Sequence, residues 1–235
     1  MRPVWPQDLL RWISDPRATH RVFDVVAHGY DMITAQAAWR ASAAGFTRGL
    51  GQATCPLILD LGAGPGNSAS AMRRARPDAR VVMLDRAPAM IQRAARVAGR
   101  EPGLAATLAD AAHLPFPDAT FDLVTGHSFL YLVPERNRVL AEARRTLKPG
   151  GQVAFLEPAA GRLSPTQWVR LAQGGLRFFL SMIGWRAMSG RHVRFSPAAL
   201  IATLAAAGFA DPTASLTLEG AGIVGRATRP KTKDE

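Results

Sequence analysis

Three aspartates follow short apolar runs in the first half of the sequence, and closely spaced glycines follow the first of them. Asp60 lies in LILDLGAGPG, Asp85 ends RVVMLD, and Asp110 ends LAATLAD. The glycines after Asp60 are Gly62, Gly64 and Gly66. Glycines let a backbone approach a ligand closely, and carboxylates accept hydrogen bonds from hydroxyl, amino and ammonium groups. The pattern predicts a binding site for a ligand that carries such groups.

The glycine-rich segment differs from a dinucleotide-binding loop. A dinucleotide fingerprint requires Gly-x-Gly-x-x-Gly, but Asn67 stands where its third glycine would be. Pro65 removes one N–H donor, which makes the loop a poor cradle for a pyrophosphate. Asp60, directly before the glycines, favours a ligand with cationic character. S-adenosylmethionine fits, because it has an ammonium, a sulfonium, a ribose and an adenine but no phosphate.

The two later aspartates complete this interpretation. Asp85 lies roughly 20 residues beyond the glycines, where an acid accepts hydrogen bonds from both ribose hydroxyls. Asp110 ends the third predicted strand and precedes Ala111, where a carboxylate can meet the adenine amino group. Three acids at successive strand ends should form a row along one edge of a sheet.

The elements that must position these residues alternate between strands and helices. We expect strands at 57–61, 80–85, 104–110, 121–127 and 151–157, and helices at 66–76, 88–99, 134–147 and 197–207. Pro134 lies in the first turn of the third helix, and Lys-Pro-Gly-Gly stops it. Such alternation predicts βαβ units with parallel strands and right-handed crossovers. Two more strands, near 213–218 and 222–227, follow each other without a helix and predict an antiparallel edge.

We therefore predict an α/β fold with a Rossmann-like open sheet. The sheet is mostly parallel with an antiparallel edge strand, and helices cover both faces. A length of 235 residues suits one domain. Its expected parts are an N-terminal helical cover (1–53), a cofactor-binding core (54–157), a lid or acceptor insert (158–196), a C-terminal helix with edge strands (197–228) and a tail (229–235).

Four segments in this order resemble the successive motifs of class I S-adenosylmethionine-dependent methyltransferases. They are LDLGAGPGNSA, VVMLDRAPAMIQRA, LADAAHLPFPDATFDLV and ARRTLKPGGQVAFLEP, within 57–157. The resemblance implies a cofactor site made of Asp60, Gly62, Ala63, Gly64, Gly66, Asp85, Arg86, Met90, Asp110, Ala111 and His127. In it, the glycine loop lines the methionine and ribose side, Arg86 and Met90 lie near the adenine, and His127 lies near the methyl donor. S-adenosylhomocysteine would be the product.

A second resemblance covers the segment before this core. HRVFDVVAHGYDMITAQAAWR, at 20–40, is similar to the N-terminal helices of the ubiquinone/menaquinone C-methyltransferase group. The resemblance implies that the region around Tyr30 closes over the cofactor. We treat Tyr30 and His127 as the candidate catalytic residues, because a phenol or an activated ring carbon must lose a proton when it is methylated.

The insert between the fifth strand and the last helix suggests where an acceptor binds. It carries the candidate acceptor residues Trp168, Phe178, Phe179, Met182 and Trp185. Between Glu157 and Asp211 there is no acidic residue, although the stretch holds several arginines. One interpretation is a lid that forms an apolar acceptor pocket, and another is a helix pair packed on the sheet edge. A third is contact with an anionic membrane, as basic helices with aromatic residues make.

The composition bears on the possible binding partners, on a metal site and on the location of the protein. The net charge of +11 attracts nucleic acid, anionic lipid or an acidic substrate and does not choose among them. A single cysteine and the absence of His, Cys or carboxylate groups at ligand spacing predict no metal site. The N-terminus lacks a clean apolar signal region, so we expect a cytoplasmic protein, peripheral to the membrane in the lipid-surface interpretation.

The leading hypothesis is a methyltransferase that acts on a small or lipid-like apolar acceptor, such as a quinone precursor, by C- or O-methylation. The alternative within the same class is a phospholipid or natural-product N-methyltransferase at a membrane surface. A nucleic-acid methyltransferase is disfavoured, because the fourth strand continues as TGHSFLYLVPE and not as an Asn/Asp-Pro-Pro-Tyr-like run. A non-catalytic cofactor-binding protein is disfavoured by the three intact aspartates.

Overall fold

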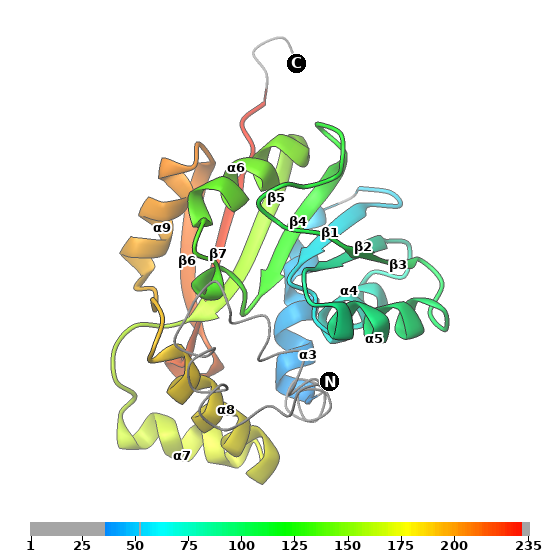
Figure 1. The fold of residues 1–235 in the computed structure, drawn as a ribbon. Helices are drawn as coiled ribbons and strands as arrows, with labels where there is room; N and C mark the ends of the chain where they lie inside the picture. Colours follow the sequence, from blue (N-terminus) through cyan, green and yellow to red (C-terminus); the bar gives the residue numbers. More distant parts are fainter. Residues whose placement is uncertain (1–35, 52, 232–235) are drawn as a thin grey trace, which may run out of the picture.

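The computed structural model describes residues 36–51 and 53–231, which form one seven-stranded sheet with helices on both faces (Figure 1). The strand order is β3-β2-β1-β4-β5-β7-β6. The strands are β1 (Leu57–Leu61), β2 (Arg80–Asp85), β3 (Leu104–Leu108), β4 (Phe121–His127), β5 (Leu147–Pro158), β6 (Ala210–Thr217) and β7 (Gly222–Thr228). The predicted fold class is confirmed.

The antiparallel part of the sheet comes from the last two strands. β1 to β5 pair in parallel, whereas β7 runs antiparallel to both β5 and β6. The last strand in sequence, β7, therefore lies between β5 and the edge strand β6. A short connection (η3, Leu218–Gly220) joins the pair, as expected for strands without an intervening helix.

The helices follow the predicted alternation. They are α3 (Ala37–Ala44), α4 (Asn67–Ala75), α5 (Pro88–Ala98), α6 (Arg136–Thr146), α7 (Pro165–Gln173), α8 (Leu176–Ser189) and α9 (Pro197–Ala206), with 3₁₀ turns η1 (Gly45–Leu50) and η2 (Leu130–Leu132). In Figure 1, α7 and α8 lie beyond the tips of β4 and β5, at the carboxyl edge of the sheet. The predicted insert is thus a helix pair at the edge where ligands bind in open α/β sheets.

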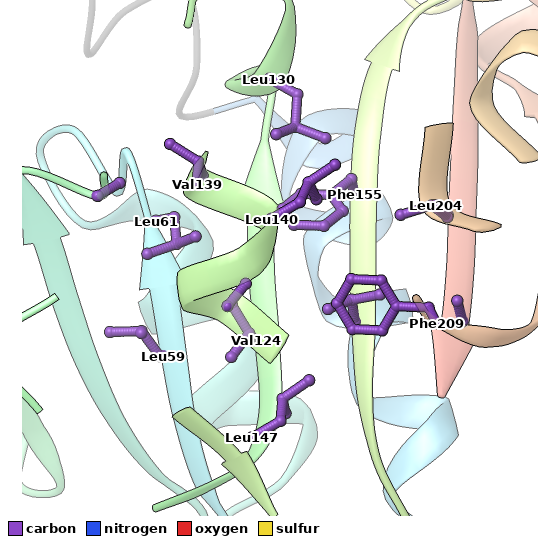
Figure 2. Close-up of a cluster of buried hydrophobic side chains, with 14 of the residues drawn as sticks. Leu59, Leu61, Val124, Leu130, Val139, Leu140, Leu147, Phe155, Leu204 and Phe209 are labelled. Carbon is purple, nitrogen blue, oxygen red and sulfur yellow. The ribbon is translucent and has the colours of Figure 1, made fainter. Parts of the chain in front are cut away.

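Two apolar clusters hold the layers together because side chains alternate between the two faces of each strand. Figure 2 shows the cluster that joins α6 and α9 to the sheet, with Leu59 and Leu61 from β1 and Phe155 from β5. The opposite cluster joins α3, α4, α5 and α8 to the sheet and contains Ile58 and Met72. Asp60 belongs to this second face of β1.

Several boundaries differ from the expectations. β3 ends at Leu108, so Asp110 follows the strand by two residues and does not end it. Pro134 precedes α6, which begins at Arg136. The Lys-Pro-Gly-Gly segment does not separate helix from strand, because Leu147 already pairs with Phe121 of β4. The differences in β3 and β5 arise because pairing with a neighbouring strand sets their ends, and local sequence carries little information about such pairing.

The glycines of the helix pair α7–α8 have different roles. Gly174 and Gly175 separate α7 from α8, and Gly175 has a φ of 94° that favours glycine. Gly184, in contrast, lies inside α8. Tertiary packing of the buried face of α8 outweighs the roughly 1 kcal/mol that an interior glycine costs.

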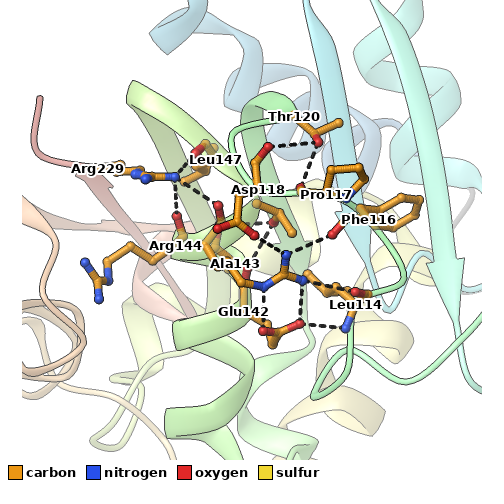
Figure 3. Close-up of polar contacts among 12 residues, drawn as sticks. Leu114, Phe116, Pro117, Asp118, Thr120, Glu142, Ala143, Arg144, Leu147 and Arg229 are labelled. Carbon is orange, nitrogen blue, oxygen red and sulfur yellow. Dashed lines mark hydrogen bonds and ion pairs between the residues drawn. The ribbon is translucent and has the colours of Figure 1, made fainter. Parts of the chain in front are cut away.

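A polar network fixes the segment that follows Asp110 (Figure 3). The guanidinium of Arg145, on α6, donates to the carbonyl oxygens of Leu114 at 3.1 Å and Phe116 at 2.9 Å. It also pairs with Glu142 at 2.8 Å and Asp118 at 2.7 Å, and these carboxylates raise the pKa of Arg145. The network fastens the irregular segment after Asp110 to α6.

Candidate functional site

The glycine loop lies between β1 and α4, at the carboxyl edge of the sheet. Gly62, Gly64 and Gly66 have φ values of 63°, 55° and 97°, in the left-handed region that favours glycine. A β-carbon on Gly62 would lie 2.3 Å from the ring of Phe129, so this position has no room for a side chain. The loop therefore presents bare backbone, as a close-fitting ligand requires.

Asp85 lies directly beside this loop. Its Oδ2 accepts a hydrogen bond from Gly64 N at 2.9 Å, and its Oδ1 accepts one from Ala87 N at 2.9 Å. Burial raises the pKa of Asp85, while these N–H donors lower it. A carboxylate has about four lone-pair sites, so both oxygens retain the capacity to accept from ligand hydroxyls. The structure thus joins the second aspartate to the glycine loop.

Asp60 is fully buried beneath the loop, with 0% of its surface exposed. Its Oδ1 accepts a hydrogen bond from Thr125 Oγ1 at 2.9 Å, and its Oδ2 has no hydrogen-bond partner. Burial raises the pKa of Asp60 to about 7, although the bond from Thr125 opposes this. An unpaired buried carboxylate oxygen is costly, and a cationic or hydrogen-bond-donating ligand group would relieve that cost.

Asp110 opens the turn after β3 and is exposed. Its Oδ1 accepts from Ala112 N at 2.9 Å, while the preceding residue is tied to the second aspartate by a bond from Ala109 N to Asp85 O at 3.1 Å. Ala111 is buried. The three predicted acids therefore lie at or just beyond the ends of neighbouring strands β1, β2 and β3; Asp60 is buried, Asp85 is partly buried and Asp110 is exposed.

The other two predicted adenine-side residues lie just beyond β2. Arg86 is exposed in the turn before α5, whereas Met90 is buried in that helix and packs with Ala87. Their placement is compatible with one polar and one apolar neighbour for a ring held at this edge.

Helix α3 covers the glycine loop from the other side. Trp39 and Arg40 border a small pocket, of about 30 Å³, together with His127 and the loop residues Gly62, Ala63, Gly64, Pro65, Asn67 and Ser68. The indole of Trp39 is buried, and its Nε1 donates to Ser181 Oγ of α8 at 3.3 Å. The cover and the lid therefore meet above the loop.

His127, the last residue of β4, lies against this cover. Its ring centroid is 5.2 Å from that of Trp39 and 5.9 Å from that of Phe46, both edge-to-face. Ser42 Oγ lies 2.8 Å from His127 Nε2 and donates to Trp39 O at 2.7 Å, which joins the imidazole to α3. Burial lowers the pKa of His127 to about 4, which keeps the ring neutral at physiological pH.

The five predicted acceptor residues separate into two groups. Phe178, Met182 and Trp185 are buried, and the Trp185 ring lies 4.9 Å from that of Trp39. Trp185 Nε1 also donates to Ser128 Oγ at 2.6 Å, directly after His127. Trp168 and Phe179 are only half-buried, and their ring centroids lie 5.8 Å apart in an edge-to-face arrangement. The lid therefore contributes Trp185 to the surroundings of His127, and the structure gives no such contact for Trp168 and Phe179.

A buried glutamate organises the turn that follows β4. Glu157, near the end of β5, accepts hydrogen bonds from the N–H groups of Phe129 at 3.1 Å, Leu130 at 2.8 Å and Tyr131 at 3.0 Å. Burial raises the pKa of Glu157 to about 7, and the three donors oppose this. The carboxylate fixes the backbone directly after His127 and Ser128.

Sequence reasoning missed several residues of this site, namely Trp39, Arg40, Ser42, Thr125, Ser128 and Glu157. Trp39 and Arg40 close the HRVFDVVAHGYDMITAQAAWR run, and Glu157 closes the last core motif, so each lay inside a segment already singled out. The other candidate catalytic residue, Tyr30, lies outside the described residues.

The described residues, 36–51 and 53–231, lack two features. Within them, no group of three or more His, Cys, Asp or Glu side chains is placed to hold a metal ion. In the same part of the chain, no helix has the length and apolarity needed to cross a membrane.

Comparisons with known proteins identify relatives of this arrangement. Residues 59–155 match the family model described as "Methyltransferase domain". The chain is 31% identical over 221 residues to a ubiquinone/menaquinone biosynthesis C-methyltransferase UbiE of Desulfotalea psychrophila, an alignment that covers 85% of each chain. It is 35% identical over 154 residues to a demethylmenaquinone methyltransferase of Thermobifida fusca, covering 61% of this chain and 62% of that one. The second alignment thus spans less than two thirds of that relative's length.

Solved structures share the fold at lower identity. The Haemonchus contortus phosphoethanolamine N-methyltransferase 2 in complex with S-adenosyl-L-methionine has a TM-score of 0.67 at 16% identity, covering 90% of this chain and 58% of that one. A SAM-dependent methyltransferase from Aquifex aeolicus has a TM-score of 0.58 at 15% identity, covering 79% of this chain and 88% of that one. At these identities the likeness concerns the fold alone.

Proposed function

The chain belongs to the class I S-adenosylmethionine-dependent methyltransferases, and we propose that it methylates a small or lipid-like apolar acceptor at a carbon or oxygen atom. The acceptor class we favour is a hydroxylated aromatic ring of the quinone-precursor type. The observation that supports it best is the cluster of Trp39, His127 and Trp185 rings next to the glycine loop.

The residues at the carboxyl edge suit the cofactor that the family uses. The unpaired Oδ2 of Asp60 would meet the ammonium, and the glycine loop would lie along the methionine and ribose. Asp85 would accept from the ribose hydroxyls while its bond to Gly64 N fixes the loop. Asp110 and Ala111 would hold the adenine edge. When bound, the cofactor supplies an electrophilic methyl group on a sulfonium.

The protein contributes alignment more than acid–base chemistry. Methyl transfer disperses charge, so the main gain comes from holding the two reactants in line, for which model reactions allow about 7–11 kcal/mol. The aromatic rings of Trp39 and Trp185 would exclude water and hold a flat acceptor. Excluding water also strengthens the electrostatic contacts inside the site.

His127 fits an orienting role better than that of a strong general base. With a pKa of about 4, its neutral ring accepts a proton only weakly near pH 7. Ser42, 2.8 Å from Nε2, would hold the imidazole in place beside the glycine loop, where the ring would orient an acceptor. Tyr30 remains the second candidate for proton transfer.

A second candidate function is N-methylation of a phospholipid or natural product at a membrane surface. The observation that favours it is an exposed apolar stripe on α8, made of Leu176, Leu180 and Ile183, beside the exposed Arg177. These residues recur at helical spacing, on the side of α8 away from Trp185. Such a stripe in an acid-free, arginine-rich segment is typical of helices that lie on anionic membranes.

The test of the favoured function follows S-adenosylhomocysteine formation with a panel of acceptors. We expect turnover with hydroxylated aromatic acceptors such as a short-chain demethylmenaquinol, and none with phosphoethanolamine or RNA. Trp185→Ala should raise the KM for the acceptor while S-adenosylhomocysteine affinity stays unchanged. Trp168→Ala is the matched control, since it removes the same side chain from α7 and leaves the Trp185–Ser128 bond intact. Turnover with phosphoethanolamine alone would favour the second candidate.

A further inference from the structure

A large groove lies on the sheet away from the glycine loop. It measures about 840 Å³, which is within the size range of small-molecule sites, and runs between α3–η1 and the pair β6–β7. The opposite face of these strands is covered closely by α9, since a β-carbon on Gly225 would lie 2.6 Å from Leu200. Because side chains alternate along a strand, Val224 and Arg226 point to the groove side.

Two arginines give the groove a net positive charge, because Asp211 is the one acidic residue among the described residues that line it. Arg226 is half-buried and donates to the carbonyl oxygens of Gly45 at 2.6 Å and Phe46 at 3.2 Å. Burial lowers the pKa of Arg226, and the charge of Arg48, exposed on the η1 wall of the groove, lowers it further. Within the described part of the chain, neither guanidinium has a carboxylate at ion-pair distance. Two guanidiniums in one groove, neither of them paired with the carboxylate of Asp211, favour a bound anion.

A row of hydroxyl groups lines the groove beside these arginines. Thr213, Ser215 and Thr217 alternate along β6 and therefore share one face, and Thr228 joins them from β7. No side-chain hydrogen bond is found for Thr213, Ser215 or Thr217 among residues 36–51 and 53–231. A row of free hydroxyls can form hydrogen bonds with the oxygen atoms of a polar ligand. An aliphatic ligand could not form these bonds.

The groove ends near the catalytic centre. Ser42 lines it and contacts His127 Nε2 at 2.8 Å, while His127 itself lines the pocket above the glycine loop. From Gly222, at the carboxyl edge, to Arg226 the strand extends about 13 Å. A ligand at the arginines would therefore lie outside the cofactor site, at the end of the groove away from His127.

We infer that this groove is a second ligand site, which takes a small oxygen-rich anion whose phosphate or carboxylate group binds between Arg48 and Arg226. The hydroxyl row of β6 would bind its remaining oxygen atoms. The inference does not depend on which acceptor is methylated, because the site is defined by its own charges and hydroxyls.

The test measures binding by isothermal titration at low ionic strength, with S-adenosylhomocysteine in excess to fill the cofactor site. The probes are inorganic phosphate, ribose 5-phosphate and free ribose. We expect ribose 5-phosphate to bind more tightly than phosphate, and ribose alone not to bind. Arg48→Gln should weaken ribose 5-phosphate binding by at least about tenfold.

Two further variants make the result specific to the groove. Asp211 is the acidic residue among the described residues that line it, so Asp211→Asn should strengthen binding of the anion. Its φ of 49° suits asparagine, so the fold should tolerate the change. Arg96→Gln removes an exposed positive charge from α5 and should leave binding unchanged. The inference would be overturned if neither inorganic phosphate nor ribose 5-phosphate bound. It would also be overturned if Arg48→Gln and Arg96→Gln weakened the binding of ribose 5-phosphate equally.

Discussion

Asp60 combines complete burial with an unpaired carboxylate oxygen, and this has a consequence for stability. Its pKa is about 7 in the folded protein and roughly 3.9 in an unfolded chain. The folded state therefore binds the Asp60 proton more tightly than the unfolded chain does. The contribution of Asp60 to the free energy of unfolding is largest below about pH 4 and is lost as the pH rises to about 7. A shift of about three units corresponds to a loss of at most about 4 kcal/mol.

Asp60→Asn should remove this loss, since an amide does not ionise and its oxygen still accepts from Thr125. Without cofactor, we expect the variant to melt at a higher temperature than the wild type at pH 8 and at a similar temperature at pH 4. S-adenosylhomocysteine should then stabilise the variant less than the wild type, because the ammonium loses its carboxylate. Thermal melts across pH measure both effects. A wild type that is the more stable at pH 8 would contradict this account of Asp60.

The positions of the aspartates and glycines at strand ends could be predicted from the sequence. One local pattern, a strand followed by a glycine-rich turn, places them there. It does not predict the partners that Ser42 and Ser128 have in the structure. Their contacts with His127 and Trp185 join α3 to β4 and β4 to α8, across long stretches of sequence. Such contacts depend on tertiary packing, for which a single sequence has no periodic signal.

At the scale of elements, the turn after β4 is held by a residue of β5, the strand that pairs with β4 in the sheet. Glu157 accepts three backbone N–H groups of this turn, and a glutamine at this position offers only one oxygen. Glu157→Gln should therefore lower the free energy of unfolding by about 1–3 kcal/mol and speed hydrogen exchange at residues 129–131. Urea titration and exchange mass spectrometry measure these changes.

Glu135→Gln provides the control for this prediction. Glu135 lies before α6 with 63% of its side chain exposed, and its contact with Arg138 is long, at 4.0 Å. We expect a change within about 0.5 kcal/mol. If the two variants were equally stable, Glu157 would have no special role in the turn.

The type and order of the elements could be predicted from the sequence more accurately than the residues at which they end. Apolar runs and capping signals gave the helices and strands of 57–157 in the right order, because these are local features. The end of β3 and the start of β5 were wrong, since pairing with β2 and β4 sets them. The exposed stripe of α8 was also missed, because its residues are apolar on both faces and only the fold shows which face is covered.

At the scale of the whole molecule, the positive charge and the α8 stripe lead to a prediction about membranes. The wild type should sediment with vesicles that contain phosphatidylglycerol at low salt, and less with pure phosphatidylcholine. Leu180→Ser combined with Ile183→Ser should reduce sedimentation, whereas Leu108→Ser, at a similarly exposed leucine at the end of β3, should not. If the wild type does not bind anionic vesicles at low salt, the membrane interpretation is wrong.

The central claim is that the cofactor binds where the glycine loop, Asp60 and Asp85 meet. Isothermal titration with S-adenosylhomocysteine tests it most directly. Asp85→Ala should weaken binding by more than about tenfold, since it removes the acceptor of the ribose hydroxyls and of Gly64 N–H. Asp78→Ala removes a surface carboxylate just before β2, at the other end of that strand from Asp85, and should leave affinity unchanged. Unchanged affinity in Asp85→Ala would contradict the account.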